Sequence, residues 1–286
     1  MLLMGIVCLS LGCLTGKFLI NKGITIDFTI ENPKHQRNIL IALATIPIIV
    51  VILLFIDQNN LPNIFALIIP EICLLYLGAY FYDLLIYSFC FMLGLLLFLE
   101  FFSKAEKSSK KPLLFALLIL TFALSVLVDQ TLPIAKYLKQ PKIINGYIVL
   151  QTTGYTCAPA TIATLGRYTK KYPNLTEREV VKLTKTDKIG TSTLKEIQAL
   201  KTLDFEPEYL KNLEINNLIN INRPAVLHVK ENYNNQIVSH AVAFLQLDKS
   251  RKIIVLANPL YGLQVKTFEQ MEEYWNGEAI FINKLA

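Results

Sequence analysis

The chain has 286 residues, of which 53% are hydrophobic and 17% are charged, and its formal net charge is +6. Globular chains carry about 25% charged residues. With a mean hydropathy of +0.43, these values exclude a disordered chain, a coiled coil and a collagen-like repeat, and they disfavour a wholly soluble protein. They also disfavour a nucleic-acid partner, because the sequence has no dense basic run with interleaved aromatic residues.

The charged residues divide the chain into two unlike parts. Residues 1–140 carry 18 of them and residues 141–286 carry 32. We therefore predict an all-α transmembrane region of four to five helices over residues 1–135, and a soluble domain over residues 141–286.

Five apolar stretches are long enough, or nearly so, to cross the hydrocarbon core of a bilayer, which takes about 20 residues. They cover residues 1–16, 38–56, 61–78, 84–99 and 112–128. Four spans are the alternative, if residues 61–102 form a single one. The first stretch has no basic residue before its apolar run and no A-x-A site, which favours an uncleaved helix over a signal peptide.

Small and charged residues within these stretches carry further expectations. Gly12 and Gly16 form a G-x-x-x-G pattern, which predicts a face where another helix packs closely. Glu71 and Asp83 lie at or near membrane depth, and we expect each to mark a helix end or to face a partner helix. A transport function would rest on these two carboxylates alone.

The positive-inside rule leaves the orientation open. Basic residues gather in one loop at positions 17–37 and in another at positions 104–111, and the rule places both loops in the cytoplasm. Four spans satisfy it and put the soluble domain outside. Five spans with the first loop inside violate it at the second loop and put the soluble domain in the cytoplasm.

Helical and strand signals are mixed in residues 141–286, which predicts an α+β domain. Capping-box spacing marks helix starts at Thr176, Thr193 and Thr267. Five strands are predicted, over residues 225–230, 238–247, 252–257, 263–266 and 279–283, with hairpin turns at 232–236 and 248–251.

Cysteine usage points to one candidate nucleophile. Four of the five cysteines lie in the apolar stretches, where they serve as small hydrophobic residues. Only Cys157 lies in the soluble domain, so that domain has no internal disulfide and no Cys-based zinc site. A lone Cys with a His and an Asn downstream is a candidate for nucleophilic catalysis.

The residues around Cys157 suit that chemistry. Cys157 precedes a predicted helix, whose N-terminus favours the reactive thiolate. His240 lies in a predicted strand and can take the thiol proton. Asn258 follows the next strand and can hold the imidazole in one tautomer. Gln151 can donate its amide N–H to a developing oxyanion, together with the backbone N–H of Cys157.

Together these residues resemble the bacteriocin-processing cysteine peptidases, the papain-like domains that precede double-glycine-leader ABC exporters. The resemblance covers about residues 145–286. It rests on the order and spacing of Gln151, Cys157, His240 and Asn258-Pro259. Further matches are Gly190-Thr191-Ser192, Pro224-Ala225-Val226 and Trp275-Asn276-Gly277.

Three departures from the family pattern matter. The family usually has Asp-Cys-Gly, where this chain has Thr156-Cys157-Ala158. The third catalytic position is usually Asp, where this chain has Asn258; we expect that Asp would serve there at least as well. No Walker A lysine motif occurs, so the exporter ATPase is missing, and the membrane part precedes the peptidase part.

The resemblance implies a membrane-integrated cysteine endopeptidase with Cys157, His240, Asn258 and Gln151 as its catalytic residues. It would cleave a leader peptide after a Gly-Gly-like site, in connection with peptide or protein export. No metal or other cofactor is expected, and the expected partners are a peptide substrate, a separate ABC exporter and the lipids of a bacterial inner membrane. The alternative is a catalytically silent module that docks export substrates. His228 is expected to be structural or on the surface, and Trp275 to pack in the core.

Overall fold

The computed structural model describes residues 2–22, 70–101 and 111–283. The chain divides into two units, Met1–Thr131 and Leu132–Ala286, hereafter the N-terminal and C-terminal units.

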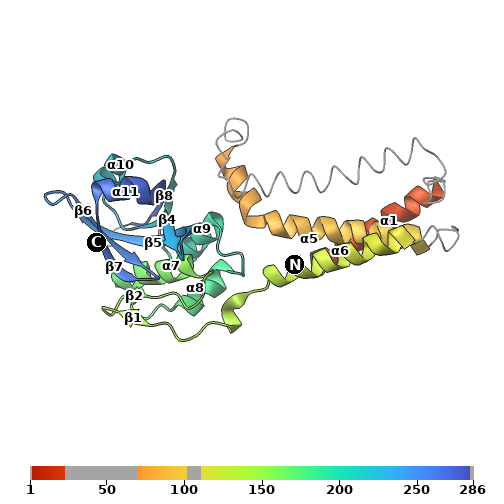
Figure 1. The fold of residues 1–286 in the computed structure, drawn as a ribbon, viewed down its shortest axis with the longest axis horizontal. Helices are drawn as coiled ribbons and strands as arrows, with labels where there is room; N and C mark the ends of the chain where they lie inside the picture. Colours follow the sequence, from red (N-terminus) through yellow and green to blue (C-terminus); the bar gives the residue numbers. More distant parts are fainter. Residues whose placement is uncertain (1, 23–69, 102–110, 284–286) are drawn as a thin grey trace. The chain divides into compact units, whose positions relative to one another are not determined.

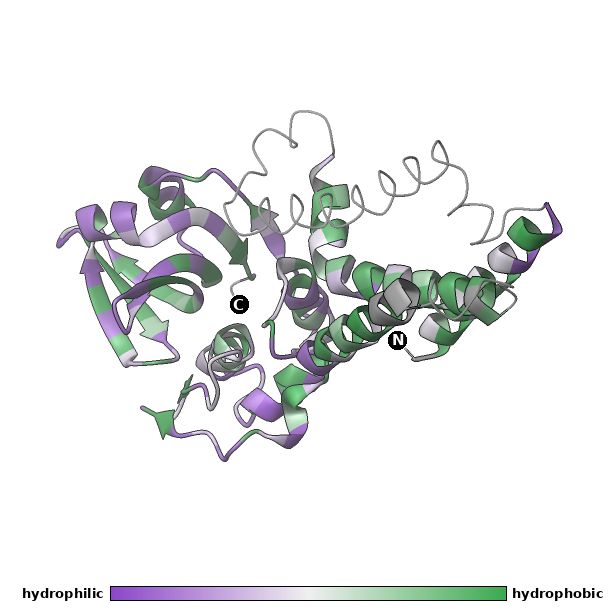
Figure 2. Ribbon diagram, turned by 45° about the vertical axis from the view of Figure 1, so that its right-hand side comes forward, coloured by the Kyte–Doolittle hydropathy of each residue, from purple (hydrophilic) through white to green (hydrophobic). Residues whose placement is uncertain are grey.

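The described part of the N-terminal unit is helical (Figure 1). It comprises α1 (Leu2–Asn21), α5 (Glu71–Phe101) and α6 (Lys111–Gln130). Hydrophobic residues run along most of their length (Figure 2). Leu3–Asn21 and Ile72–Leu99 are long and apolar enough to cross a membrane, and Leu117–Gln130 is a shorter apolar stretch.

Over their described part, the stretches at residues 61–78 and 84–99 are not separate helices, in line with the alternative of a single span over residues 61–102. They belong to one helix, α5, which spans 31 residues. α5 itself contains no proline, and a single glycine such as Gly78 does not end a helix in an apolar sequence. The predicted span at residues 38–56 and the first part of 61–78 lie outside the described residues.

Glycines bring α1 and α5 into close contact. A Cβ atom on Gly12 would lie 2.1 Å from the carbonyl oxygen of Phe91, and one on Gly94 would lie 2.1 Å from that of Leu9. A Cβ atom on Gly16 would lie 3.1 Å from the Cβ of Phe98. The G-x-x-x-G prediction is therefore confirmed as a helix-packing face, with Gly94 as its counterpart on α5.

This packing predicts that Gly94→Ala weakens the N-terminal unit. The added methyl meets backbone, which cannot move aside, so a loss of about 1–3 kcal/mol is expected. Gly78→Ala is the matched control on the same helix, because no atom lies within 4 Å of its added Cβ. The measurement is the SDS concentration that halves the helical circular dichroism signal of the full chain. Equal midpoints for the two variants would contradict this account.

The C-terminal unit is built on a six-stranded antiparallel sheet of order β3-β8-β4-β5-β6-β7. Its strands are β3 (Glu208–Leu210), β4 (Ala225–Tyr233), β5 (Gln236–Asp248), β6 (Ile253–Asn258), β7 (Gly262–Thr267) and β8 (Trp275–Phe281). A short 3-10 turn, η1 (Ile134–Lys136), and a small hairpin of β1 (Ile143–Ile144) and β2 (Ile148–Val149) precede it.

Helices cover both faces of this sheet (Figure 1). One face packs against α7 (Cys157–Tyr168), α8 (Glu177–Thr184) and α9 (Thr193–Thr202), and the other against α10 (Ile215–Ile221) and α11 (Phe268–Tyr274). Side chains of β5 alternate between the two cores, because successive residues of a strand point to opposite faces. Ala241 and Ala243 thus lie in the first core, and Val242 and Phe244 in the second.

The α+β prediction is confirmed, and so are two of the three helix starts. Thr176 and Thr267 each form a complete capping box with the residue three positions later. The prediction at Thr193 is wrong by one residue, because Ser192 is the N-cap of α9 and makes no side-chain cap bond. The five predicted strands are present with shifted ends.

Candidate active site

Cys157 is the first residue of α7, and the loop before it is tied to other elements by backbone groups. The Gln151 N–H donates to the carbonyl oxygen of Pro259 at 2.9 Å. The Thr152 N–H donates to Oε1 of the fully buried Glu177 at 2.9 Å. The loop therefore joins the start of α7 to the turn that follows β6.

The first turn of α7 packs against the backbone of β5. Thr161 Oγ1 donates to the Ala241 carbonyl oxygen at 3.0 Å. The Ala241 backbone also lies close enough to the Cys157 thiol to lower its pKa. Cys157 is thereby held beside the residue that directly follows His240.

His240 and Asn258 are in direct contact. His240 Nε2 lies 3.1 Å from Asn258 Oδ1, and both residues are buried. The same Oδ1 accepts the Leu260 N–H at 2.9 Å, which identifies it as the carbonyl end of the amide. His240 must therefore donate from Nε2, and Nδ1 is the ring nitrogen that can accept a proton.

Burial disfavours the charged forms of both Cys157 and His240. Burial raises the pKa of the Cys157 thiol to about 11, with Glu196 adding to the rise and hydrogen bonds from the backbone of Ala241, Ala158 and Cys157 itself opposing it. Burial lowers the pKa of His240, and the Asn258 hydrogen bond and the Glu231 charge oppose that fall. The loss of solvation thus opposes the thiolate that the helix start favours.

Gln151 lies in the same region. Its Nε2 donates to the Thr153 carbonyl oxygen at 2.8 Å, which uses one of the two amide hydrogens and leaves the other for a ligand. Its Oε1 is buried and has no hydrogen-bond partner among the described residues. The Gln151 backbone is bonded to Pro259, which directly follows Asn258. The loop from Gln151 also leads to Cys157. The four predicted residues therefore lie in one region of the structure.

Sequence reasoning missed two residues at this site, Glu231 and Tyr274. Asn258 Nδ2 donates to Glu231 Oε2 at 2.8 Å, and Tyr274 OH donates to the same oxygen at 2.6 Å. The signal for Glu231 is the Asn234-Asn235 pair, whose positive φ angles of 51° and 61° form a two-residue hairpin turn. That turn sets Val229 of β4 opposite His240 of β5. Glu231 is two residues after Val229, so its side chain lies on the same face of the sheet as that of His240.

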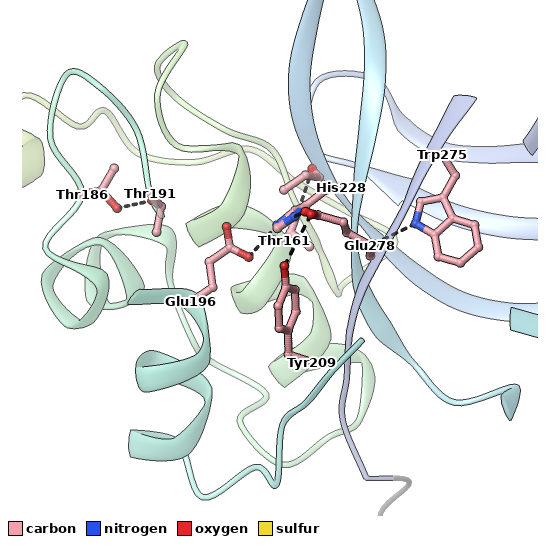
Figure 3. Close-up of polar contacts among 9 residues, drawn as sticks. Thr161, Thr186, Thr191, Glu196, Tyr209, His228, Trp275 and Glu278 are labelled. Carbon is pink, nitrogen blue, oxygen red and sulfur yellow. Dashed lines mark hydrogen bonds and ion pairs between the residues drawn. The ribbon is translucent and has the colours of Figure 1, made fainter. Parts of the chain in front are cut away.

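His228 has a structural role, which is one of the two roles expected from the sequence. It lies on the opposite face of the sheet, half-buried between two carboxylates (Figure 3). Its Nε2 is 3.0 Å from Glu196 and its Nδ1 is 3.0 Å from Glu278. Burial alone would lower the pKa of His228, but the two carboxylates raise it to about 10, so the ring is a cation at neutral pH.

The His228 cluster predicts a pH-dependent stability. The pKa of His228 is raised above its ordinary value of 6.5, so its stabilisation is complete below pH 6.5 and is lost as the pH rises through 10. His228→Gln should cost about 3–5 kcal/mol at pH 6 and progressively less toward pH 10. The fluorescence of Trp275, the single tryptophan of the chain, reports unfolding of this unit. A difference between wild type and variant that stays constant from pH 6 to 10 would contradict the assignment.

Most of the C-terminal unit matches a known protein family. A family model described as Peptidase C39 family matches residues 145–286. Among solved structures, the peptidase domain of Streptococcus ComA, a bi-functional ABC transporter involved in a quorum-sensing pathway, is 23% identical, with a TM-score of 0.42 over 49% of this chain and 100% of that domain. A double glycine motif protease from an AMS/PCAT transporter, solved in complex with the leader peptide, is 20% identical, with a TM-score of 0.40 over 51% of this chain and 99% of that one. No curated protein matches the chain.

Proposed function

Residues 145–286 belong to the Peptidase C39 family of cysteine peptidases that cleave double-glycine leaders, and on this premise we propose that the chain is a membrane-integrated cysteine endopeptidase that removes leader peptides. The observation that carries the proposal is the set in which the half-buried Cys157 lies beside residue 241 and the buried His240 is hydrogen-bonded to Asn258. A nucleophile, a base and an orienting group then stand in the order that acyl transfer needs.

In the proposed reaction the thiol and imidazole start as a neutral pair. Cys157 Sγ attacks the scissile carbonyl carbon while its proton passes to His240 Nδ1. The oxyanion accepts hydrogen bonds from the free amide hydrogen of Gln151 and from the Cys157 backbone N–H. His240 then protonates the leaving nitrogen, the C–N bond breaks, and a thioester remains on Cys157.

Hydrolysis of the thioester completes the cycle. His240 Nδ1 takes a proton from water as the water oxygen attacks the thioester carbon. The C–S bond breaks and the proton returns to Sγ, which restores the neutral pair. Asn258 accepts the Nε2–H throughout and stabilises the imidazolium that forms in each half of the reaction.

We further propose that the helices of the N-terminal unit hold the peptidase at a membrane. The two apolar helices Leu3–Asn21 and Ile72–Leu99 support this by length and composition. Because no Walker A lysine motif occurs in the sequence, transport of the cleaved peptide would fall to a separate ABC exporter. The peptidase would then work at the membrane where leader-bearing peptides are handed over.

Cys157→Ala tests the function directly. The variant should fold normally but lose cleavage of a fluorogenic peptide with an internal Gly-Gly by about 10⁴-fold or more, because no other group replaces the nucleophile. Cys90→Ala, in the N-terminal unit, is the matched control and should retain the wild-type rate. Cleavage by Cys157→Ala at the wild-type rate would contradict the proposed mechanism. A wild-type chain that binds the peptide without cutting it would favour the docking alternative.

Gln151→Ala should lower turnover more than binding. An oxyanion donor acts mainly in the transition state, so kcat is expected to fall by about 10²–10³-fold with KM little changed. Steady-state kinetics on the same peptide separate the two parameters. A change confined to KM would mean that Gln151 binds the substrate and does not stabilise an oxyanion.

A further inference from the structure

Asn258 connects His240 to a buried carboxylate that belongs to a different strand. Its Nδ2 donates to Glu231 Oε2 of β4 at 2.8 Å, and its Oδ1 faces His240 Nε2 at 3.1 Å. Asn258 is fully buried and Glu231 is 8% exposed. The Tyr274 hydroxyl of α11 donates to the same Glu231 oxygen at 2.6 Å and so holds the carboxylate in place.

This chain of contacts determines which end of the amide faces the imidazole. An ionised carboxylate only accepts hydrogen bonds, so Glu231 can pair only with the NH₂ end of Asn258. The carbonyl end is thereby directed at His240, and a carbonyl can pair only with a protonated Nε2. Reversal of the amide would place NH₂ against Nε2 and would favour the tautomer with the proton on Nδ1, which could not accept the thiol proton.

Resting on the proposed peptidase function, we propose that Glu231 is a positioning residue for its reaction. It acts through Asn258, whose orientation it fixes together with the Leu260 N–H that donates to Oδ1. It also supplies the negative charge behind His240 that an Asp at position 258 would otherwise carry. The peptidase site thus consists of Cys157, His240, Asn258 and Glu231 acting in series, with Tyr274 securing the last member.

Glu231 also changes the expectation for Asp at position 258. An Asn258→Asp side chain would bring a second carboxylate against Glu231, and two carboxylates in direct contact cannot both ionise, so one must take up a proton. The single substitution should therefore lose activity as the pH rises and that proton is released. Asp at position 258 should serve well only when position 231 is neutral and can donate a hydrogen bond.

Other titratable groups near His240 and Tyr274 differ from Glu231 in their contacts. Burial disfavours the charged form of Cys157, as described above. The pKa of Tyr274 is raised by burial, by its hydrogen bond to Glu231 and by the nearby Tyr261, so its hydroxyl stays protonated. Lys266 Nζ lies 4.0 Å from the centre of the Tyr274 ring and makes a cation–π contact with it. Among these groups, Glu231 is the carboxylate that accepts a hydrogen bond from Asn258, at 2.8 Å.

The experiment compares three variants of the full chain in detergent micelles: Glu231→Gln, Asn258→Asp and the double variant. Glu273→Gln, an exposed carboxylate on α11, is the matched control. Two readouts are taken. One is kcat and KM on the Gly-Gly peptide across pH. The other is the tautomer of His240, read by NMR of ¹⁵N-labelled histidine and needing no substrate.

Glu231→Gln is expected to lower kcat by about 10- to 100-fold with KM nearly unchanged, as when an outer partner of a reactive group is removed. Part of the His240 population should move to the Nδ1–H tautomer, and the acid limb of the kcat profile should shift to lower pH. The double variant should recover kcat to within a few-fold of wild type, because the amide introduced at position 231 can donate to the carboxylate introduced at position 258. Glu273→Gln should match wild type.

The proposal is overturned if Glu231→Gln keeps both the wild-type kcat and the Nε2–H tautomer, or if a folded double variant is no more active than the better single variant. The double variant retains one carboxylate and one amide in the buried pair, so it decides the matter even where Glu231→Gln does not fold. If the wild-type chain cleaves no peptide, the proposed function fails. The tautomer comparison then still decides whether Glu231 positions His240.

Discussion

The backbone of Ala241 is the point on which the arrangement of the site depends. β6 pairs with β5 only from Ala243 onward, which leaves the Ala241 groups on that edge without a strand partner. Buried backbone groups must be hydrogen-bonded, and here α7 provides a partner, because Thr161 donates to the Ala241 carbonyl. The Cys157 thiol lies close to the same backbone. One unpaired step in the sheet thus places the start of a helix beside Ala241, the residue that follows His240.

Two histidines on the two faces of the sheet show how surroundings decide protonation. On β4 and β5, His228 pairs with Ala241, and Val229 pairs with His240, so the rings lie close in register but face opposite cores. His228 contacts two carboxylates and is a cation. His240 contacts an amide and has only one carboxylate behind it, so burial keeps it neutral. A base must be neutral to accept a proton, whereas a structural ion pair must be charged.

Much of the C-terminal unit could be predicted from sequence because its signals are local. Short stretches of sequence reveal the capping boxes at Thr176 and Thr267 and the strands β4 and β5. The candidate site is recognised from the order of its residues, which are Gln151, Cys157, His240 and Asn258. The pKa of Cys157 and the contact of Glu231 with Asn258 could not be read this way, because burial and strand register arise from long-range packing. β3, with three residues, carries too short a pattern, and the continuity of α5 was hidden by Gly78 and Asp83.

The central claim is that His240 activates a thiol that is otherwise neutral, and alkylation of Cys157 tests it most directly. Iodoacetamide labels the full chain from pH 6 to 11, and mass spectrometry of the peptide containing Cys157 gives the rate for wild type and for His240→Gln. The account predicts a much faster wild-type reaction at pH 7 and a ratio that falls toward one near pH 11, where the thiol ionises without help. Equal rates for the two proteins across the neutral range would contradict it.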